Sequence, residues 1–524
     1  MTTVGEALVA GLAARGVEVV FGIPGVHTVE LYRGLAGSTI RHVTVRHEQG
    51  AAFAADGYAR VSGKPGVAFV ITGPGLTNAL TAMAQARADS IPMLVVSGVN
   101  RRASLGNGLG LLHELPDQAA MVATLCPTRM ILAADQVGPA LDWAFATLAT
   151  GRPGPVHLDV PTDVMPLFCP DPGPLTVPTA RPKPPPDALA QAAARLTGPV
   201  VILAGGGARH AGPALQALAE TLDAPVVLTA NARGLLHGHP LSVPGSMSLY
   251  AARGLIAPGV QVLAVGTELG PTDYDMYVRG GLPDLSGMIR IDVCARQLAR
   301  HPAALTLQGD AAQVMAAVHA ALRGPPRHIG GAARAAQARD AARAELAGLN
   351  PAMPAQLGMV EAIRAALPGA IIVGDSTQPV YAANLFYDHD RPGGWFNAAT
   401  GYGALGYAPG AAVGAAIAAP GTEVICLIGD GGLQFSPGEL RTAVDEALPI
   451  TFVVWNNAGF REIAEAMAGA GVQVIGCTPT PLKLAPFAIA CDLPFMAVTP
   501  DPAALLAALR DPGPRPRMIE VRVP

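Results

Sequence analysis

The sequence predicts an α/β protein with three doubly wound parallel-sheet domains. Along its 524 residues, short apolar runs of strand length alternate with longer Ala- and Leu-rich segments of helical character. This alternation is typical of parallel strands joined by helical crossovers. A single hydrophobic core seldom grows past roughly 250–300 residues, so a chain of this length should divide into several domains. Half of the residues are hydrophobic, which is enough to fill several large cores.

Two segments that resist regular structure mark the expected boundaries. Residues 171–187 are so rich in proline that neither a continuous helix nor a central strand can form there. Residues 324–331 carry Gly-Pro-Pro and Gly-Gly, and an Ala- and Arg-rich helical segment follows to about Leu349. We therefore expect an N-terminal domain over residues 1–170, a middle domain over 188–325 and a C-terminal domain over 352–524.

Composition argues against several classes of protein. The net charge is −4 and there is no long basic run, so we expect no nucleic-acid partner. The N-terminus lacks the basic and apolar regions of a signal peptide. Residues 401–420 are the most membrane-like stretch, but they are mostly Gly and Ala and contain Pro409, so we expect a packed internal helix and no membrane partner. The cysteines have no zinc-like spacing and indicate reduced thiols of a cytoplasmic protein.

The N-terminal domain places a carboxylate at the start of a predicted helix. Residues 40–60 read as a strand running into a helix, with Glu48 in its first turn. A carboxylate there gains from the helix dipole when charged, whereas burial favours a neutral form that can donate a hydrogen bond. The structural alternative is an ion pair of Glu48 with Arg46 or Arg60.

Other polar residues of this domain fall near the same predicted sheet edge. Residues 70–78 predict a strand, a glycine turn and a helix, and they include Thr72 and Asn78. Residues 111–118, LLHELPDQ, form a polar patch in which His113 is either a proton relay or a structural histidine bonded to Glu114 or Asp117. His27, after the first strand and turn, is a second candidate, with a partly exposed loop histidine as its alternative.

The middle domain shows three strands that each end in a glycine-rich turn, at residues 200–207, 225–234 and 262–272. Such turns alone are weak evidence for a bound nucleotide. Asp292, at the end of another predicted strand, is the residue that would contact a ribose.

The C-terminal domain carries the most informative pattern, residues 424–460. Two apolar runs joined by a helix-length crossover predict a parallel βαβ unit, so Asp430 and Asn457 should meet at the carboxyl edge of the sheet. A carboxylate and an amide oxygen suit Mg²⁺ bound together with phosphates. The neighbouring glycines allow backbone N–H groups to approach those phosphates: Gly429, Gly431 and Gly432.

This Gly-Asp-Gly to Asn-Asn pattern resembles the thiamine diphosphate (ThDP) signature of the acetolactate synthase and 2-oxo acid decarboxylase superfamily. The resemblance covers essentially the whole chain and implies three α/β domains, known as PYR, middle and PP. It also implies that Asp430, Asn457 and the Gly459 carbonyl bind Mg²⁺. Glu48, in HEQGAAFAADGYAR, matches the glutamate that bonds the aminopyrimidine ring of ThDP and promotes deprotonation of the thiazolium carbon.

The same resemblance implies roles for residues elsewhere in the chain. The segment containing Thr72 and Asn78 would lie beside the thiazolium ring. In YGALG, the Gly403 carbonyl would receive the aminopyrimidine amine, and Leu405 would hold the cofactor rings in place, as a residue of nearly the volume of the family's methionine. The diphosphate would lie at the end of the strand in IIVGDSTQ, against Ser376, Thr377 and Gln378.

Within the superfamily, the chain looks most like the 5-guanidino-2-oxopentanoate decarboxylase branch. Acetolactate synthases carry phenylalanine and glutamine before Glu114, where this chain has Leu112 and His113, and a histidine in place of Pro379. We therefore expect non-oxidative decarboxylation of a 2-oxo acid to an aldehyde and CO₂. A guanidinium substrate needs a carboxylate partner; Glu462 is the first candidate, unless it is only a surface helix residue, and Glu114 the second.

Two other functions share these motifs. An acetolactate synthase-like carboligase would keep every cofactor residue, and a non-catalytic homologue would tolerate their loss. By resemblance, Glu48 and the diphosphate site come from different subunits, so a homodimer is the minimal active unit, and we expect a homotetramer. Some relatives bind FAD or a CoA nucleotide in the middle domain; here we expect that domain to be structural, without FAD.

Overall fold

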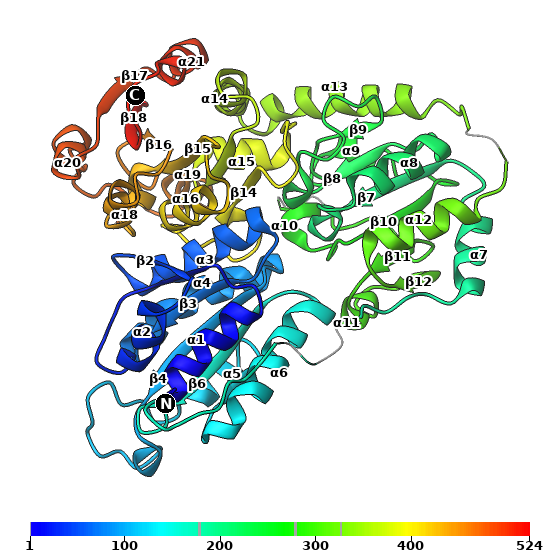
Figure 1. Ribbon diagram of the computed structural model, residues 1–524. Coiled ribbons are helices and arrows are strands. Elements are labelled where there is room, and N and C mark those ends of the chain that lie inside the picture. The colour runs from blue at the N-terminus through cyan, green and yellow to red at the C-terminus, as the bar shows by residue number, and fades with distance from the viewer. Residues whose placement is uncertain (1, 175, 177–179, 277–279, 325–326) are drawn as a thin grey trace. The chain divides into compact units, whose positions relative to one another are not determined.

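The computed structural model describes residues 2–174, 176, 180–276, 280–324 and 327–524 (Figure 1). The chain forms two compact units. One comprises Met1–Ala180, Gly401–Met496 and Gly513–Glu520, and the other comprises Arg181–Thr400, Ala497–Pro512 and Val521–Pro524. Parts of both predicted linkers, residues 175, 177–179 and 325–326, lie outside the described residues. The three domain boundaries given above stay predictions.

The first sheet belongs to the N-terminal part of the chain. Its strands are β1 (Val19–Gly22), β2 (Arg41–Thr44), β3 (Gly66–Val70), β4 (Met93–Val99), β5 (Thr128–Met130) and β6 (Pro155–Pro161). They are parallel, in the order β2-β1-β3-β4-β6-β5. The accompanying helices are α1 (Val4–Ala14), α2 (Val29–Ala36), α3 (Glu48–Ser62), α4 (Pro74–Asp89), α5 (Gln118–Ala123) and α6 (Val137–Thr150).

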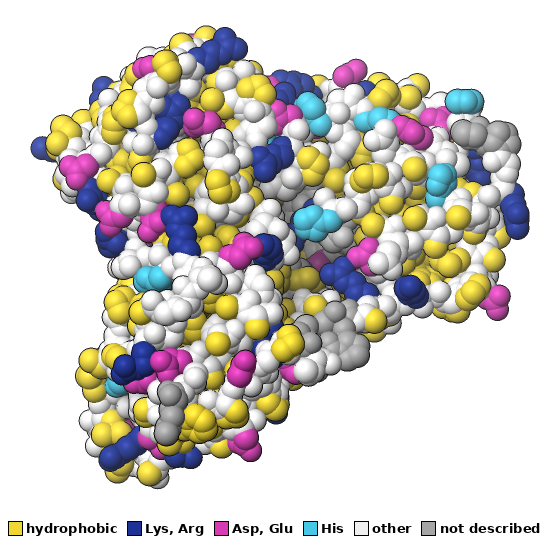
Figure 2. Space-filling view, in the orientation of Figure 1, with side chains coloured by type: hydrophobic (Ala, Val, Ile, Leu, Met, Phe, Trp, Pro, Cys, Tyr) yellow, Lys and Arg dark blue, Asp and Glu magenta, His cyan; other side chains and the backbone are white. Residues whose placement is uncertain are grey.

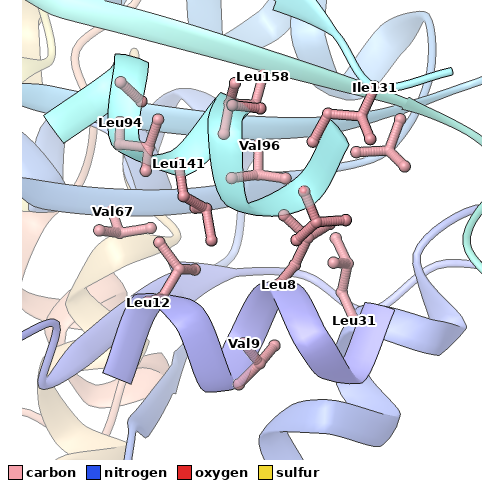
Figure 3. Packing of buried hydrophobic residues seen from close by; sticks show 14 of the residues in the cluster. Leu8, Val9, Leu12, Leu31, Val67, Leu94, Val96, Ile131, Leu141 and Leu158 are labelled. Carbon is pink, nitrogen blue, oxygen red and sulfur yellow. The ribbon is translucent and has the colours of Figure 1, made fainter. Parts of the chain in front are cut away.

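An apolar core fills the space between this sheet and its helices. The helix α1 begins with a capping box, in which Thr3 and Glu6 each accept a hydrogen bond from the other's backbone N–H. Figure 3 shows Leu8 and Leu12 of α1 directed toward strand and α6 side chains such as Leu94 and Leu141. Every residue of β3 and β4 is buried, as expected for central parallel strands covered on both faces.

The second sheet is also parallel. Its strands are β7 (Val200–Ala204), β8 (Val226–Leu228), β9 (Ser242–Val243), β10 (Gln261–Val265), β11 (Ile289–Asp292) and β12 (Leu305–Gln308), in the order β12-β11-β10-β7-β8-β9. The helices of this region are α7 (Pro186–Arg195), α8 (Gly212–Leu222), α9 (Tyr250–Arg253), α10 (Pro271–Tyr274), α11 (Ala295–Leu298), α12 (Ala311–Ala321) and α13 (Gly331–Leu349).

The glycines at the strand ends of this second sheet pack against one another. The N–H of Gly207 donates to the Gly266 carbonyl at 2.9 Å. A Cβ atom on Gly205 would lie only 2.5 Å from that same carbonyl oxygen. The close approach of two turns therefore explains these glycines without a ligand. Asp292 ends β11, and its carboxylate accepts the Cys294 N–H at 2.8 Å.

The third sheet contains the Gly-Asp-Gly segment. Its strands are β13 (Ile371–Gly374), β14 (Trp395–Asn397), β15 (Val424–Gly429), β16 (Ile450–Asn456), β17 (Phe495–Val498) and β18 (Arg517–Arg522), in the order β14-β13-β15-β16-β18-β17. The helices are α14 (Met353–Ala366), α15 (Gln378–Leu385), α16 (Tyr407–Ala418), α17 (Asp430–Leu433), α18 (Glu439–Asp445), α19 (Arg461–Gly469), α20 (Leu484–Ala490) and α21 (Pro502–Arg510). The three sheets confirm the predicted α/β fold class.

The predicted βαβ unit is present, with one difference. The strands β15 and β16 pair in parallel over the whole of β15, from Val424 opposite Ile450 to Gly429 opposite Trp455. The crossover, however, contains two short helices, α17 and α18, where the sequence predicted one. The segment between them contains Pro437, which lacks the N–H that a continuous helix needs.

The helix α16 lies in the segment that most resembled a membrane span, and it packs instead against α3. A Cβ atom on Gly57 of α3 would lie 2.0 Å from the Ala411 carbonyl oxygen. Equally, a Cβ atom on Gly414 of α16 would lie 1.8 Å from the Ala54 carbonyl oxygen. The two backbones therefore touch directly, and the predicted internal packing is confirmed. No helix among the described residues is long and apolar enough to cross a membrane.

The surface charges and the cysteines were also considered in the sequence, where we expected no basic run and reduced thiols. On the face shown in Figure 2, Lys and Arg side chains are interspersed with Asp and Glu side chains. All six cysteines are free thiols: Cys126, Cys169, Cys294, Cys426, Cys477 and Cys491.

Candidate active site

Glu48 is the first residue of α3, as predicted. His47 caps the helix, with its Nδ1 accepting the N–H of Gln49 at 3.1 Å. The side chain of Asn78, from the neighbouring helix α4, donates its Nδ2–H to Glu48 Oε2 at 3.0 Å. The structure thus brings together two of the predicted cofactor residues, which lie 30 positions apart in the sequence.

The two arginines considered as partners of Glu48 form ion pairs with other carboxylates. Arg46 pairs with Asp445 of α18. Arg60 is buried and pairs with Asp56 at 2.6 Å and with Asp89 at 2.7 Å. The Glu48 carboxylate accepts its hydrogen bond from a neutral amide instead.

A second carboxylate, Glu439 of α18, holds the chain just before Glu48. Its Oε1 accepts the backbone N–H groups of Arg46 at 3.1 Å and His47 at 3.2 Å. Thr442 donates to the other oxygen at 2.8 Å. Only 1% of Glu439 is exposed, and this burial raises the pKa of its carboxyl above the usual range, against the opposing effect of these hydrogen bonds. Sequence reasoning missed this residue.

The Thr72–Gly73 turn lies against two histidines. A Cβ atom on Gly73 would lie 2.5 Å from the His113 carbonyl oxygen, and Gly73 has a positive φ of 64°. The rings of His27 and His113 meet edge to face, with centroids 5.2 Å apart. The strand residue Gly98 has no room for a side chain because the His27 carbonyl oxygen and Thr72 Oγ1 would lie within about 3 Å of a Cβ atom. The two predicted histidines and Thr72 therefore share one small region.

Three buried polar atoms in this region have no hydrogen-bond partner among the described residues: Thr72 Oγ1, His27 Nδ1 and His113 Nδ1. His113 also has a φ of +62°, a left-handed conformation that costs roughly 1–2 kcal/mol for a residue with a Cβ atom. Buried groups left without partners in this way are expected where a ligand completes them. Burial, together with nearby His113, lowers the pKa of His27, so this ring is neutral at pH 7.

The carboxylates proposed as structural partners of His113 bond to backbone amides. Glu114 accepts the N–H groups of Leu109 at 3.1 Å and Leu111 at 3.0 Å. These hydrogen bonds lower the pKa of Glu114. Asp117 caps α5 by accepting the Ala120 N–H at 2.8 Å. Glu114 is thus tied to its own loop, whereas His113 packs against His27.

The Gly-Asp-Gly and Asn-Asn segments meet as predicted. Asp430 follows β15, is 4% exposed, and accepts the backbone N–H of Asn457 at 3.3 Å. The N–H of Gly459 is also directed at the Asp430 carboxylate. Burial raises the pKa of Asp430, and the surrounding N–H groups oppose that rise. The neighbouring Asn456 is turned away and bonds Glu520 of β18 at 2.6 Å.

The donor set around Asp430 fits Mg²⁺ better than a transition metal. No cluster of three or more His, Cys, Asp or Glu side chains able to hold a metal occurs in the described part of the chain. Asp430, Asn457 and Gly459 offer a carboxylate, an amide oxygen and a carbonyl oxygen, which are hard ligands. A Cβ atom on Gly431 of α17 would lie 2.6 Å from a ring carbon of Phe460, so a larger residue here would displace that side chain.

The predicted Gly403 and Leu405 lie in the turn before α16. Gly403 and Gly406 both have positive φ, 76° and 79°, and a Cβ atom on Gly403 would meet no described atom within 4 Å. The turn is anchored by Ser436, which donates to the Gly406 carbonyl at 2.7 Å, and by Gln85, which accepts the Ala404 N–H at 3.3 Å. Leu405 is half-buried.

The predicted diphosphate residues belong to the second unit. Ser376 follows the buried Asp375, whose carboxylate accepts the Ser376 N–H at 2.9 Å. Thr377 is the N-cap of α15, makes no side-chain capping hydrogen bond, and is followed by Gln378 and Pro379 in the first turn. Helix N–H groups at such an end can bind phosphate oxygens.

Glu462 lies on an exposed element. It is in the first turn of α19, a helix with no buried residue. Although its side chain is accessible to solvent, neighbouring protein atoms and the charge of Glu465 raise the pKa of Glu462.

Comparison with known proteins identifies the family. The chain matches the N-terminal TPP binding domain of thiamine pyrophosphate enzymes over residues 2–121, their central domain over 189–318 and their C-terminal TPP binding domain over 375–521. The chain belongs to the thiamine pyrophosphate enzyme family. Thiamine diphosphate, also called thiamine pyrophosphate, is therefore its cofactor, and its substrates are small molecules.

Individual relatives include both reaction types expected from the sequence. The chain is 43% identical to the probable 2-ketoarginine decarboxylase of Pseudomonas aeruginosa over 487 residues, which cover 91% of this chain and 86% of that protein. It is 32% identical to the acetolactate synthase of Mycobacterium bovis, over 86% of this chain and 75% of the relative. It is 29% identical to the acetolactate synthase isozyme 1 large subunit of Escherichia coli, over 99% of this chain and 93% of that protein. The resemblance inferred from the motifs is confirmed.

Proposed function

We propose that this thiamine pyrophosphate enzyme decarboxylates a 2-oxo acid with a guanidino side chain, 5-guanidino-2-oxopentanoate, to the aldehyde and CO₂. The observation that carries the proposal is the His27–His113 pair against the Thr72–Gly73 turn. Release of an aldehyde requires a proton donor beside the reacting carbon, and imidazoles with free ring nitrogens can provide it. The relative named as a probable 2-ketoarginine decarboxylase supports the choice of substrate, because 2-ketoarginine is another name for this oxo acid.

The residues around Glu48 have distinct roles in this proposal. ThDP, when bound, supplies the electron sink for decarboxylation. Glu48 bonds the aminopyrimidine ring, and Asn78 holds the Glu48 carboxylate in place through its hydrogen bond. Thr72 and neutral His27 offer their free polar atoms to the substrate side, and His113 delivers the proton that becomes part of the aldehyde.

Magnesium and diphosphate binding involve the C-terminal part of the chain. We assign Asp430, Asn457 and the Gly459 carbonyl to Mg²⁺. Because burial raises the pKa of Asp430, protons compete with the metal at a higher pH than for an ordinary aspartate. Diphosphate oxygens are bound by the start of α15, with Ser376, Thr377 and Gln378.

For the guanidinium group we propose Glu462 as the partner. Glu114, the second candidate, already accepts two backbone N–H groups, so its oxygens are less available. Glu462 has no such backbone partner among the described hydrogen bonds, and its first-turn position follows the Mg²⁺ segment directly.

We further propose a homodimer as the minimal active unit, within a homotetramer. Large apolar side chains that are exposed in the single chain support a subunit interface: Tyr402 is 56% exposed, Phe435 55% and Ile463 54%. The free thiols support a reducing, cytoplasmic setting.

A panel of 2-oxo acids tests the proposed reaction. The full chain is incubated with ThDP and Mg²⁺, and CO₂, aldehyde and carboligation product are measured separately. The expected result is aldehyde and CO₂ in equal amounts from 5-guanidino-2-oxopentanoate, with much lower kcat/KM for pyruvate. Efficient formation of acetolactate from pyruvate would instead support the carboligase activity named for the acetolactate synthase relatives.

A further inference from the structure

A row of buried polar side chains crosses the first sheet and ends at the Thr72–Gly73 turn. It begins at Thr128 on β5 and continues through the buried residues His157 and Asp159 on β6, Ser97 on β4 and Gln118 at the start of α5. Polar groups inside an apolar sheet lower stability unless they are hydrogen-bonded. None of them has a role in the reaction described above, so their presence requires another explanation.

The donor and the acceptor of each hydrogen bond in this row can be assigned. Ser97 Oγ–H donates to Asp159 Oδ1 at 2.9 Å. His157 Nε2, 2.8 Å from Ser97 Oγ, must then carry the proton that it donates to that hydroxyl. The other ring nitrogen, Nδ1, therefore accepts from Thr128 at 2.6 Å. This arrangement requires a neutral imidazole, in agreement with burial, which lowers the pKa of His157 to about 3.

The side-chain amide of Gln118 connects this row to the turn. Its Nε2 donates to the Gly98 carbonyl at 2.8 Å and to Asp159 Oδ1 at 3.0 Å. Its Oε1 accepts the backbone N–H of Gly73 at 3.0 Å. Only an amide supplies two donors on one side and an acceptor on the other, so these contacts fix the orientation of Gln118.

Asp159 is the centre of the row. It is completely buried, and its Oδ2 has no hydrogen-bond partner within the described residues. Burial raises the pKa of Asp159 to about 7, against the hydrogen bonds from Ser97 and Gln118, and the charge of Asp117 raises it further. The other titratable neighbour, His157, is neutral, so no adjacent cation in this row favours the charged carboxylate.

We propose that Gln118 is a positioning residue for the reaction and that Asp159, whose Oδ1 accepts from the Gln118 amide, holds it in place. Gly73 is wedged between the Gln118 amide and the His113 carbonyl, and its positive φ leaves the turn dependent on outside contacts. By fixing Gly73, Gln118 sets the position of Thr72 and of the backbone at His113. The inference rests on the proposed function only in placing the cofactor beside this turn.

Three variants of the full chain test this role. Gln118→Met keeps the side-chain volume and removes the amide. Asp159→Asn keeps the shape of the uncharged carboxyl and cannot ionise. Thr128→Val is the matched control, because it changes the far end of the same row without reaching the turn. Each is examined for hydrogen exchange of residues 70–76 without cofactor, for ThDP affinity by calorimetry, and for kcat and KM with the best 2-oxo acid.

Gln118→Met is expected to accelerate exchange at residues 70–76 and to weaken ThDP binding or kcat by about tenfold, because a buried N–H loses its acceptor. Asp159→Asn should remain within about threefold of the parent in kcat, and Thr128→Val within about twofold. If Gln118→Met does not fold, Gln118→Asn, whose amide is too short for both contacts, replaces it.

Stability as a function of pH tests the protonation of Asp159. Because its pKa in the folded chain is about 7, above the ordinary value of 3.8, the parent loses stability as pH rises from about 4 through 7. Asp159→Asn has no such loss, so its unfolding midpoint should exceed that of the parent at pH 8.5, with a smaller difference at pH 5.

Several outcomes would overturn the inference. Unchanged exchange and ThDP affinity in Gln118→Met would remove its positioning role. An equal loss in Thr128→Val would indicate a general packing effect. A loss of activity in Asp159→Asn at every pH would mean that an accepting oxygen at this position is not enough to hold Gln118. Failure of all 2-oxo acids to react would contradict the proposed function. Hydrogen exchange and ThDP affinity would still test the role of Gln118.

Discussion

Glu48 and Glu462 are the carboxylates proposed to bond the cofactor ring and the substrate side chain, and their surroundings are opposite. Glu48 begins a largely buried helix, accepts a hydrogen bond from Asn78, and follows a backbone held by Glu439. Glu462 lies on α19, which buries none of its residues. One carboxylate is fixed by three elements of the fold, whereas the other is carried on an exposed helix.

This difference matches the two proposed roles, bonding of the cofactor by Glu48 and selection of the substrate by Glu462. A residue that bonds the cofactor must be held in one geometry, and a buried frame of hydrogen bonds provides that. A residue that selects a side chain benefits from an exposed element, which can change without disturbing a core. We therefore expect changes at Glu48 and its buried neighbours to abolish turnover or folding. Changes on the exposed helix α19 should alter only substrate preference.

The largest effect is expected at Glu48. Glu48→Gln keeps the volume of the side chain but removes the ability, proposed for Glu48, to exchange a proton with the cofactor. We expect kcat to fall by about 10²–10⁴-fold, with ThDP affinity changed only a few-fold. Steady-state CO₂ release and calorimetric titration of ThDP measure the two quantities. Glu18→Gln, at an exposed ion pair with Lys64, is the control and should have no effect on kcat. Unchanged turnover in Glu48→Gln would refute the assignment.

An intermediate effect is expected at Glu439. Glu439→Ala leaves the N–H groups of Arg46 and His47 without their acceptor inside the protein, at about 1–3 kcal/mol for each buried group. We expect the free energy of unfolding in urea to fall by about 2–4 kcal/mol, and kcat to fall with it. Glu439→Gln retains the accepting oxygen and is the matched comparison, expected within about 1 kcal/mol of the parent. Equal stability of the alanine variant and the parent would show that this contact does not support Glu48.

The smallest and most selective effect is expected at Glu462. Glu462→Gln removes the charge proposed to pair with a guanidinium group, so KM for 5-guanidino-2-oxopentanoate should rise about tenfold or more. KM for an uncharged 2-oxo acid and the unfolding midpoint should not change. Glu465→Gln, on the same exposed helix, is the control. A similar rise for the uncharged substrate, or in the control, would contradict a specific ion pair.

Local sequence patterns predicted the elements that carry the site. The apolar run before Asp430, the start of α3 at Glu48 and the packed Gly- and Ala-rich helix all follow from periodicity and residue type. The divided crossover between β15 and β16 was missed, although Pro437 and Gly438 are a recognisable interruption.

Hydrogen bonds between residues far apart in the sequence could not be predicted in the same way. Glu439 bonds backbone groups that lie 393 and 392 positions earlier, and no local pattern indicates such a pairing. Gln118 lies within a segment recognised as polar, but its contact with Gly73 depends on how α5 meets the sheet. The one available signal was Asp159, a carboxylate between Leu158 and Val160 in a strand that is otherwise mostly apolar.

The direct contact between the backbones of α3 and α16 has a practical consequence for engineering this enzyme. The spacing of the two helices is set by main-chain atoms at Gly57 and Gly414, so no change of rotamer can compensate for an added methyl group. Libraries that seek new substrates should therefore leave these glycines unchanged and vary α19, where replacements leave the core intact. The proposed selectivity of this enzyme should thus be open to redesign independently of its catalytic machinery.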